Sequence, residues 1–366
     1  MTHENEPADL AYWVGFQLIP GVGPARIARL RQAFGDLERA WRASSLDLAR
    51  SGIDGRLSQV IADRRRGIDP AAEIAKIERH AVTTIASVDS RYPDRLRQID
   101  AAPAMLFARG KLESTGERTV AVVGTRRPTA YGRQITERLV VDLIQAGVTI
   151  VSGLARGIDS VAHRTAIEAG GRTVAVLGCG LDVNYPPENA GLSRQIVAGG
   201  GAVITEFPLG TGPDAGNFPA RNRIISGLSL GTLVIEAGEI SGALITARVA
   251  AEQGRDVFAV PGPITSPASI GTHRLIQDGA KLVTSVNDIL EELDLGRVEQ
   301  QLVMRDLLPA NDVEASLLRA LSHQPTHIDD VCRSTTLAIA TVSSTLSMME
   351  LKGMVRQTGG MTYVLA

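Results

Sequence analysis

Six short runs of apolar, mostly β-branched residues alternate with helix-length stretches in the middle of the chain. The runs are VAVVG (120–124), VTIVSG (148–153), TVAVLG (173–178), AVITE (202–206), TLVIEA (232–237) and VFAVPG (257–262). Because both alternating faces of each run are apolar, the runs are typical of strands covered by helices on both sides. The pattern predicts an α/β fold, a Rossmann-like doubly wound and mostly parallel sheet. Such sheets bind ligands at the carboxyl ends of their strands, so the residues after each run are the candidates for function.

A helical pattern precedes this core. From Asp9 to His80, Leu, Ile and Ala recur at three-to-four spacing, which predicts a separate small domain of the helix-hairpin-helix or SAM-like kind over residues 1–80. Its LIPGVGPAR segment (18–26) places Gly21 and Gly23 between two helices. Two interpretations stay open: the backbone N–H groups of this turn meet a phosphate, or the glycines only permit a tight turn.

The remaining pattern predicts three further segments. Residues 81–295 form the core, with one or two edge strands added between Ala81 and Gly110. Residues 296–310 form a linker, and residues 311–366 form a final domain. In that domain two strand-like pieces around Val355 and Tyr363 follow three predicted helices, at 313–322, 328–334 and 337–352. Three helices followed by a hairpin is the order of a winged helix.

Composition narrows the classes of function. The chain carries 38 basic and 40 acidic residues, a net charge of −2, so binding of nucleic acid would need a local patch of cations. Its two cysteines, Cys179 and Cys332, lie in different predicted domains, which excludes a disulfide framework and a Cys-based zinc site. With no basic, apolar leader and no run of about 18 uncharged apolar residues, we expect a soluble, cytoplasmic protein without a membrane segment.

Cations, glycines and hydroxyl groups gather after the predicted strands. VAVVGTRR delivers Arg126 and Arg127 to the carboxyl edge of the sheet just before a helix. SGLARGID, FPARNRIIS and the segment from Glu236 to Thr246 add further polar residues at helix starts, namely Gly153, Arg156, Gly157, Arg221, Asn222, Arg223, Ser241 and Gly242. Glycine-rich helix starts bearing cations are suited to phosphate. Ordinary tight turns between strand and helix are the alternative interpretation.

The signals for catalysis and for a cofactor are weaker. No G-x-G-x-x-G follows the first strong strand, and Val183 stands where the third glycine would follow Gly178 and Gly180, so a nicotinamide enzyme is disfavoured. The chain has no HExxH, G-x-S-x-G or Walker A sequence and no metal-ligand spacing among its histidines; His163 is interpreted as a helix-face residue. Glu206 and Glu236 end strands and are either an acid/base or ribose-binding pair or anchors for loops. We therefore expect no metal and no cofactor.

Taken together, these motifs resemble those of the DNA-processing protein DprA (Smf) family. The resemblance covers residues 85–285 closely, through GTRRPTAYG, SGLARGIDSVAH, VAVLGCGLDVNYP, TEFP, FPARNRIISGLS, EAGEISGALITA, AVPG and GTHRLIQDGA. It also fits the helical domain and the winged helix. The resemblance implies a cytoplasmic protein that binds single-stranded DNA without sequence preference, forms a homodimer, and helps to load the recombinase RecA during natural transformation.

The resemblance also assigns roles to residues. It implies that the main phosphate contacts are Arg126, Arg221 and Arg223. The second group of candidates consists of positions where the DNA backbone approaches closely, namely Gly153, Gly157, Ser241 and Gly242. Arg127, Arg156 and Asn222 complete the polar set, and Phe218, Tyr131 or Tyr185 offer surfaces on which bases stack. The segment GTHRLIQDGA lies where the family's dimer contact is placed, which suggests Leu275 and Ile276.

The sequence leaves two alternative functions open for the core domain. An enzyme of the lysine-decarboxylase-like phosphoribohydrolase group would share this kind of sheet, but its P-G-G-x-G-T signature is replaced here by EAGEISGALIT, and we expect no enzymatic activity. A free nucleotide bound as a regulator is the other alternative.

In the winged helix, LAIATVSSTLSMMEL (337–351) has no Lys or Arg. We therefore expect this domain to bind duplex DNA weakly and to contact proteins instead.

Overall fold

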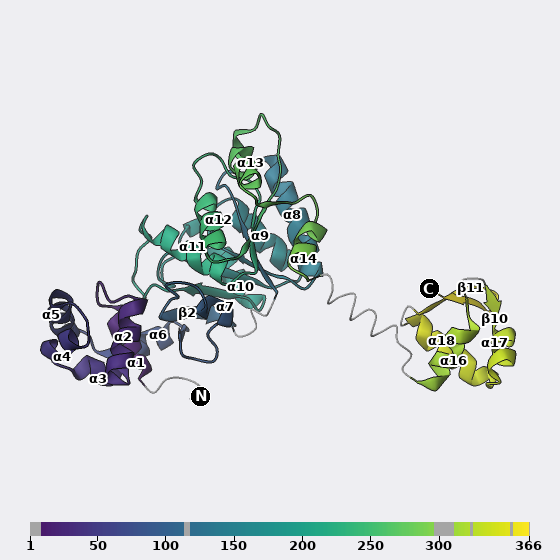
Figure 1. The fold of residues 1–366 in the computed structure, drawn as a ribbon, viewed down its shortest axis with the longest axis horizontal. Helices are drawn as coiled ribbons and strands as arrows, with labels where there is room; N and C mark the ends of the chain where they lie inside the picture. Colours follow the sequence, from purple (N-terminus) through teal and green to yellow (C-terminus); the bar gives the residue numbers. More distant parts are fainter. Residues whose placement is uncertain (1–8, 113–117, 296–310, 323–324, 352–353, 366) are drawn as a thin grey trace. The chain divides into compact units, whose positions relative to one another are not determined.

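The computed structural model describes residues 9–112, 118–295, 311–322, 325–351 and 354–365. The chain divides into two compact units, Met1–Ile289 and Leu290–Ala366, and Figure 1 traces the elements of each. Within the described ranges, no helix has both the length and the apolar character needed to cross a membrane. The predicted linker, 296–310, lies outside the described residues.

Short helices form the start of the first unit. They are α1 (Leu10–Gln17), α2 (Pro24–Phe34), α3 (Leu37–Arg42), α4 (Ser45–Arg50), α5 (Gly55–Arg64), the 3-10 turn η1 (Arg65–Gly67) and α6 (Pro70–Arg79). Side chains of Asp36, Ser44, Asp54 and Asp69 accept backbone N–H groups where α3 to α6 begin, which satisfies donors that a helix start leaves open. The turn between α1 and α2 runs through Gly21 at a φ of 86°, a conformation that favours glycine.

These helices share one hydrophobic cluster with the sheet, although the sequence predicted a separate domain. Trp13 of α1 belongs to the same buried cluster as Phe107 and Leu177 of the core. Gln17 Nε2 donates a hydrogen bond of 3.0 Å to the backbone oxygen of Glu206. Because the apolar side chains of both segments are removed from water together, the two segments form one compact unit.

The core is a nine-stranded sheet of order β1-β2-β6-β5-β4-β3-β7-β8-β9. Its strands are β1 (Thr83–Ala86), β2 (Met105–Gly110), β3 (Thr119–Val123), β4 (Thr149–Ser152), β5 (Thr173–Val176), β6 (Ala202–Thr205), β7 (Gly231–Val234), β8 (Asp256–Ala259) and β9 (Lys281–Leu282). The pairs β1–β2 and β2–β6 are antiparallel and the other pairs are parallel. The six apolar runs therefore form parallel strands, as predicted, and β1 and β2 are the expected edge strands.

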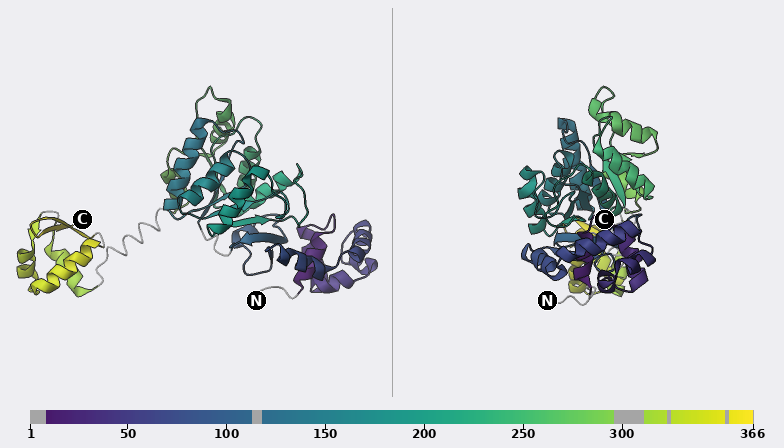
Figure 2. Two further views of the ribbon diagram at one scale, coloured as in Figure 1. Left: turned by 180° about the vertical axis from the view of Figure 1, so that it is seen from behind. Right: turned by 90° about the vertical axis from the view of Figure 1, so that its left-hand side faces the viewer.

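Helices connect the parallel strands and cover both faces of the sheet (Figures 1 and 2). The connecting helices are α8 (Ala130–Gln145), α9 (Ile158–Glu168), α10 (Ala190–Ala198), α11 (Asn217–Gly227), α12 (Gly242–Glu252) and α13 (Ile270–Gln277), and α14 (Val286–Glu292) follows the last strand, β9. From β3 the chain moves through β4 and β5 to β6, then returns to β7 and moves outward in the other direction. Right-handed crossovers in opposite directions place their helices on opposite faces. The direction changes between β3 and β7, and the crevice at their carboxyl ends is where doubly wound sheets bind ligands.

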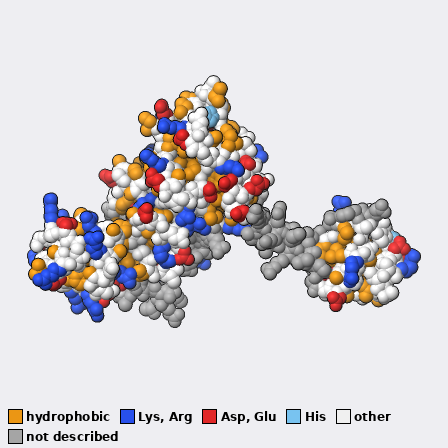
Figure 3. Space-filling model, in the orientation of Figure 1, with side chains coloured by type: hydrophobic (Ala, Val, Ile, Leu, Met, Phe, Trp, Pro, Cys, Tyr) orange, Lys and Arg blue, Asp and Glu red, His pale blue; other side chains and the backbone are white. Residues whose placement is uncertain are grey.

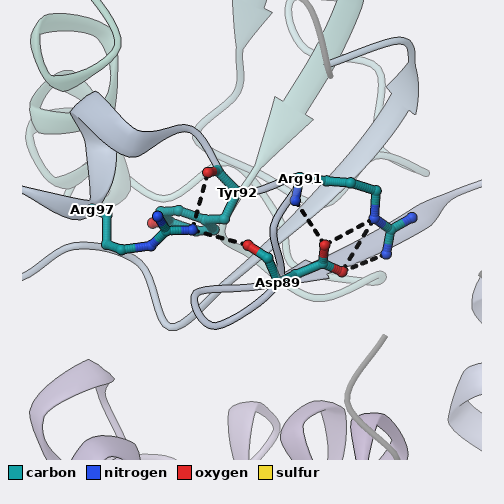
Figure 4. A network of polar contacts seen from close by, with 4 residues as sticks. All are labelled: Asp89, Arg91, Tyr92 and Arg97. Carbon is teal, nitrogen blue, oxygen red and sulfur yellow. Dashed lines mark hydrogen bonds and ion pairs between the residues drawn. The ribbon is translucent and has the colours of Figure 1, made fainter. Parts of the chain in front are cut away.

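A polar network around Asp89 holds the segment between β1 and β2 (Figure 4). The carboxylate of Asp89, whose side chain is fully buried, accepts the Arg91 backbone N–H at 2.8 Å and pairs with the Arg91 guanidinium at 2.5 Å. The Arg97 guanidinium donates to the carbonyl oxygens of Asp89 and Tyr92 and lies 5.6 Å from the ring centroid of Tyr92. These charge-assisted bonds fix the short helix α7 (Asp94–Arg97) beside the sheet.

The described residues of the second unit contain a winged helix. Its elements are α16 (Asp312–Ala320), β10 (Thr326–His327), α17 (Ile328–Thr335), α18 (Ile339–Leu351), β11 (Val355–Gly359) and β12 (Thr362–Leu365). The three strands pair in the order β10-β12-β11, and buried Leu317, Val331 and Leu346 pack beneath them in one cluster with Tyr363. The predicted helices and hairpin are confirmed. The short strand β10 was not predicted, because two residues are too few to show alternation.

Candidate nucleic-acid interface

A groove of about 780 Å³ lies at the switch point of the sheet. It is lined by the loops after β3 and β7 and by the first turns of α11 and α12, and it contains seven of the predicted residues: Arg126, Arg127, Phe218, Arg221, Asn222, Ser241 and Gly242. A cavity of about 30 Å³ shares Arg126, Phe218 and Arg221 with the groove and adds two more predicted residues, Gly153 and Arg156. The structure therefore brings nine of the eleven predicted residues to one edge of the sheet.

The loop that carries Arg126 and Arg127 is held by Glu236, which follows β7. The backbone N–H of Thr125 donates to the Glu236 carbonyl oxygen at 2.8 Å. At the other end of the loop, the Glu236 carboxylate accepts the Thr129 N–H at 2.9 Å and the Thr129 hydroxyl at 2.5 Å. Glu236 is 3% exposed, and Thr129 in turn caps α8. The two arginines thus stand on a loop fixed at both ends, which supports the anchor interpretation of Glu236.

Arg126 and Arg127 are exposed cations at the groove. In the described part of the chain neither is engaged in an ion pair, whereas the guanidinium of Arg156 pairs with the exposed carboxylate of Glu188. On the face drawn in Figure 3, basic and acidic side chains are interspersed over the core, in keeping with the near-zero net charge. Any attraction for an anion at the groove is therefore local and comes chiefly from the loop after β3.

Two aromatic rings lie beside these cations. The Arg126 guanidinium is 5.7 Å from the ring centroid of Phe218, within the range of a cation–π contact. Phe218 and Tyr185 lie with ring centroids 5.5 Å apart and planes tilted by 41°. Both rings line the groove, and Tyr185 is 36% exposed. A groove that combines arginines outside any ion pair of the described residues with a half-buried and an exposed ring, Phe218 and Tyr185, offers partners for both the phosphates and the bases of a single strand.

Arg221 lies beneath the groove and is bonded within the protein. Its side chain is 5% exposed and donates hydrogen bonds to the carbonyl oxygens of Gly153 and Val176. The buried carboxylate of Asp159 accepts backbone N–H groups of Gly153 and Ala155, and burial raises its pKa although the Arg221 cation acts to lower it. The predicted phosphate contact is thus a buried cation beneath the groove that is bonded to backbone carbonyl oxygens and acts on the nearby Asp159 carboxylate through its charge.

Two of the three predicted glycines, Gly153 and Gly157, are required by close contacts within the fold. A Cβ on Gly153 would lie 2.1 Å from the Arg221 guanidinium. A Cβ on Gly157 would lie 2.3 Å from the carbonyl oxygen of Thr125, and the φ of Gly157 is +81°. Both glycines therefore allow a close approach of protein to protein, and Gly157 supports the arginine loop from below.

Arg223 is directed away from the groove. It forms an ion pair of 2.5 Å with Glu206, where both side chains are largely buried. Burial raises the pKa of Glu206 although the Arg223 cation acts to lower it. With Glu206 paired to Arg223 and Glu236 bonded to Thr129, the geometry favours loop anchors over an acid/base pair. Within the described ranges, no cluster of His, Cys, Asp and Glu is suited to a metal ion.

The start of α12 faces the groove. Ser241 caps the helix by accepting the Ala243 N–H at 3.3 Å, and a Cβ built on Gly242 would meet nothing within 4 Å. Asn222 Nδ2 donates to the Gly242 carbonyl oxygen at 3.5 Å, so its amide links α11 to this helix start. Ile240, directly before Ser241, also lines the groove and was not a predicted site residue.

The candidate dimer residues lie on α13, which carries the GTHRLIQDGA segment (Figure 1). Leu275 and Ile276 are both half-buried, and Leu275 packs against the core cluster that contains Val234 and Ala237. The backbone N–H of Gly271, at the start of α13, donates to the carbonyl oxygen of Ala237 at 2.8 Å. The dimer contact stays a prediction.

Comparison with known proteins places the chain in a family. The family model described as DNA recombination-mediator protein A matches residues 82–294, more than half of the chain. The chain belongs to the DprA (Smf) family. A model of the DprA winged helix domain matches residues 305–361, in agreement with the elements of the second unit.

Individual DprA and Smf proteins are similar over much of the chain. Protein Smf of Synechocystis sp. is 37% identical over 394 residues, covering 97% of this chain and 98% of that protein. The crystal structure of DprA from Streptococcus pneumoniae matches with a TM-score of 0.68 and 39% identity, over 77% of this chain and 97% of that one. A structure of DprA from Helicobacter pylori, described by its single-stranded DNA binding mode, matches with a TM-score of 0.52 and 29% identity, over 58% of this chain and 95% of that one.

The contacts of Glu236 lead to a prediction for this DprA-family groove. A Glu236→Gln variant is expected to bind a dT oligonucleotide about three- to tenfold more weakly, because its amide cannot accept from both donors of Thr129 and the arginine loop loses a charge-assisted anchor. Fluorescence anisotropy on the folded variant measures the loss. In an Arg126→Ala/Arg127→Ala background the same change should cost little more affinity, because the cations it positions are gone.

Glu239→Gln is the matched control. Glu239 is exposed, lies three residues further along the same loop, and loses the same charge on substitution. This variant should bind at least as tightly as wild type, because a negative charge near the groove is removed. Equal weakening by both substitutions would contradict a positioning role for Glu236.

Proposed function

We propose that this chain binds single-stranded DNA without sequence preference in the groove between the loops after β3 and β7. Arg126 and Arg127 contact the phosphates, and Phe218 and Tyr185 contact bases. The observation that carries the proposal is the fixed loop: two exposed arginines outside any ion pair in the described ranges, on a loop held at both ends, beside the rings of Phe218 and Tyr185 and at the switch point of the sheet. Binding that ignores sequence requires this combination of backbone cations and stacking surfaces. Membership in the family and the described binding mode of the H. pylori relative support it.

The proposed role extends to what happens to the bound strand. The protein would act as a homodimer that protects incoming single-stranded DNA and helps to load RecA during transformation. The resemblance to the DprA family supports this part, and the half-buried Leu275 and Ile276 on α13 are the proposed dimer contacts. No catalytic step is proposed, since the carboxylates of Glu206 and Glu236 are occupied by Arg223 and Thr129.

Binding of labelled single- and double-stranded dT-containing oligonucleotides across a salt series tests the proposal. Wild type should prefer the single strand, with affinity that falls steeply as salt rises. An Arg126→Ala/Arg127→Ala variant should bind at least tenfold more weakly, and the slope of log affinity against log salt should fall by roughly 0.7 for each phosphate contact removed. Both arginines are exposed, so the fold should be preserved.

An Arg164→Ala/Arg194→Ala variant is the matched control. These arginines are exposed on α9 and α10 and do not line the groove. Their substitution removes the same two positive charges as the Arg126→Ala/Arg127→Ala variant. If this variant loses as much affinity as the groove variant, binding follows net charge and not the groove. Absence of a single-strand preference in wild type would overturn the proposal and direct attention to a free nucleotide as the ligand.

A further inference from the structure

Two isoleucines form an unexplained apolar part of the groove. Ile240 is 99% exposed and Ile245, in the first turn of α12, is 42% exposed. Both line the same groove as the arginine loop. A single exposed isoleucine elsewhere on a surface needs no explanation. Here, however, two of them line the same groove as the arginine loop, and a phosphate bound by those arginines would make no favourable contact with them.

The backbone around Ile240 is fixed on both sides. Three residues before it, the Ala237 N–H donates to the Ala268 carbonyl oxygen at 2.8 Å, and the Ala237 carbonyl oxygen accepts the Gly271 N–H at the same distance. One residue after it, Ser241 caps α12. The side chain is therefore presented to solvent from a short, anchored loop. In the protein alone this apolar surface remains in water, and it contributes favourable energy only when a ligand covers it.

We infer that Ile240 and Ile245 form an apolar wall that contacts the nucleobases of single-stranded DNA in the groove. The inference rests on the proposed function and adds a base-contacting surface on a different element from Phe218 of α11. Nucleobases are the apolar part of the same ligand whose phosphates suit Arg126 and Arg127, so one ligand uses both halves of the groove. In a duplex the faces of the bases are stacked against one another and cannot contact this wall. The wall therefore increases affinity for single strands only.

The test separates contacts to bases from contacts to phosphates. Affinity is measured by anisotropy for a dT oligonucleotide and for an oligonucleotide of equal length made of abasic residues, which keeps the phosphates. Ile240→Ser should weaken dT binding about three- to tenfold and leave abasic binding unchanged, because only the bases cover the isoleucine. Ile240→Trp, which enlarges the surface available for stacking, should tighten dT binding and leave abasic binding unchanged.

Ile264→Ser is the matched control, because Ile264 is 90% exposed and does not line the groove. It should change neither affinity. If Ile240→Ser leaves dT binding intact, or weakens dT and abasic binding equally, the apolar wall is wrong while the proposed function stands. If wild type binds neither oligonucleotide, the proposed function itself fails. All three substitutions fall on exposed side chains, so loss of folding does not confuse the readout.

Discussion

An Arg221→Ala variant is expected to lose about 3–5 kcal/mol of the free energy of unfolding at neutral pH, because it leaves the buried Asp159 carboxylate without the buried cation that offsets its charge. The Arg221 side chain is 5% exposed, and the buried carboxylate beside it belongs to Asp159. The substitution also removes the donor to the carbonyl oxygens of Gly153 and Val176. Urea unfolding followed by circular dichroism measures the loss as a lower midpoint.

The deficit should depend on pH, because the Arg221 cation lowers the pKa values of two buried groups, Asp159 and His163, and its removal raises both. Burial raises the pKa of Asp159 above its ordinary value of 3.8, and Arg221 opposes that shift, so removing the cation raises the pKa further. A carboxyl with a raised pKa in the folded state binds its proton more readily there than in the unfolded state. Stability of the variant relative to wild type should therefore improve as pH falls through the raised pKa. A loss caused only by missing hydrogen bonds would not change with pH.

Two further variants complete this test. Adding Asp159→Asn to Arg221→Ala removes the unpaired charge and should restore part of the lost stability, which is non-additive behaviour expected of a coupled pair. Arg156→Ala removes an arginine whose ion pair with Glu188 is exposed, and it should leave the urea midpoint unchanged. If the Asp159→Asn change instead adds to the loss, the pair is not the source of the instability.

The strands were the most predictable part of the fold. A parallel strand covered by helices must be apolar on both faces, and the runs that meet this condition became β3 to β8. The position of the site followed, since Arg126 and Arg127 come directly after one of these runs. The anchoring by Glu236 could not be predicted, because its contact with Thr129 spans 107 residues and depends on the order of the strands.

The burial of Arg221 could have been predicted from the spacing of the apolar residues around it, which the motif FPARN does not show. Arg221 shares a helix face with Ile224, Ile225 and Leu228 at the spacing of a buried stripe, and all three are at most 3% exposed. Periodicity would thus have placed this arginine inside, while Arg126, on a loop, stays outside. What periodicity does not supply is the partner, since a buried arginine implies a buried carboxylate somewhere without naming Asp159.

Acidification from pH 7.5 to pH 5 is expected to cost the core about 2 kcal/mol through His163 alone. The side chain lies fully buried in α9, and burial together with the nearby Arg221 cation lowers its pKa from 6.5 to about 3. The Thr173 hydroxyl donates to the Ile150 carbonyl oxygen at 2.9 Å, so it accepts from the neutral ring at Nδ1, 2.7 Å away. Protonation would place a second cation near Arg221 in the buried core.

The direction of this change in stability with pH follows from where His163 binds its proton, in the folded or in the unfolded chain. Between pH 6.5 and about 3 the unfolded chain binds a proton at His163 that the folded core does not, so stability falls as pH falls through this window. Asp159 and Glu206, whose pKa values are raised by burial, act in the opposite direction, and a pH series on wild type alone therefore mixes the effects of the three groups.

Comparing wild type with His163→Asn isolates the histidine, because the asparagine amide keeps a donor toward Thr173. The variant should lose less stability than wild type between pH 7.5 and pH 5, by about 2 kcal/mol in urea unfolding. Parallel pH profiles for the two proteins would show that His163 becomes protonated within the folded core, which is incompatible with its burial against Arg221.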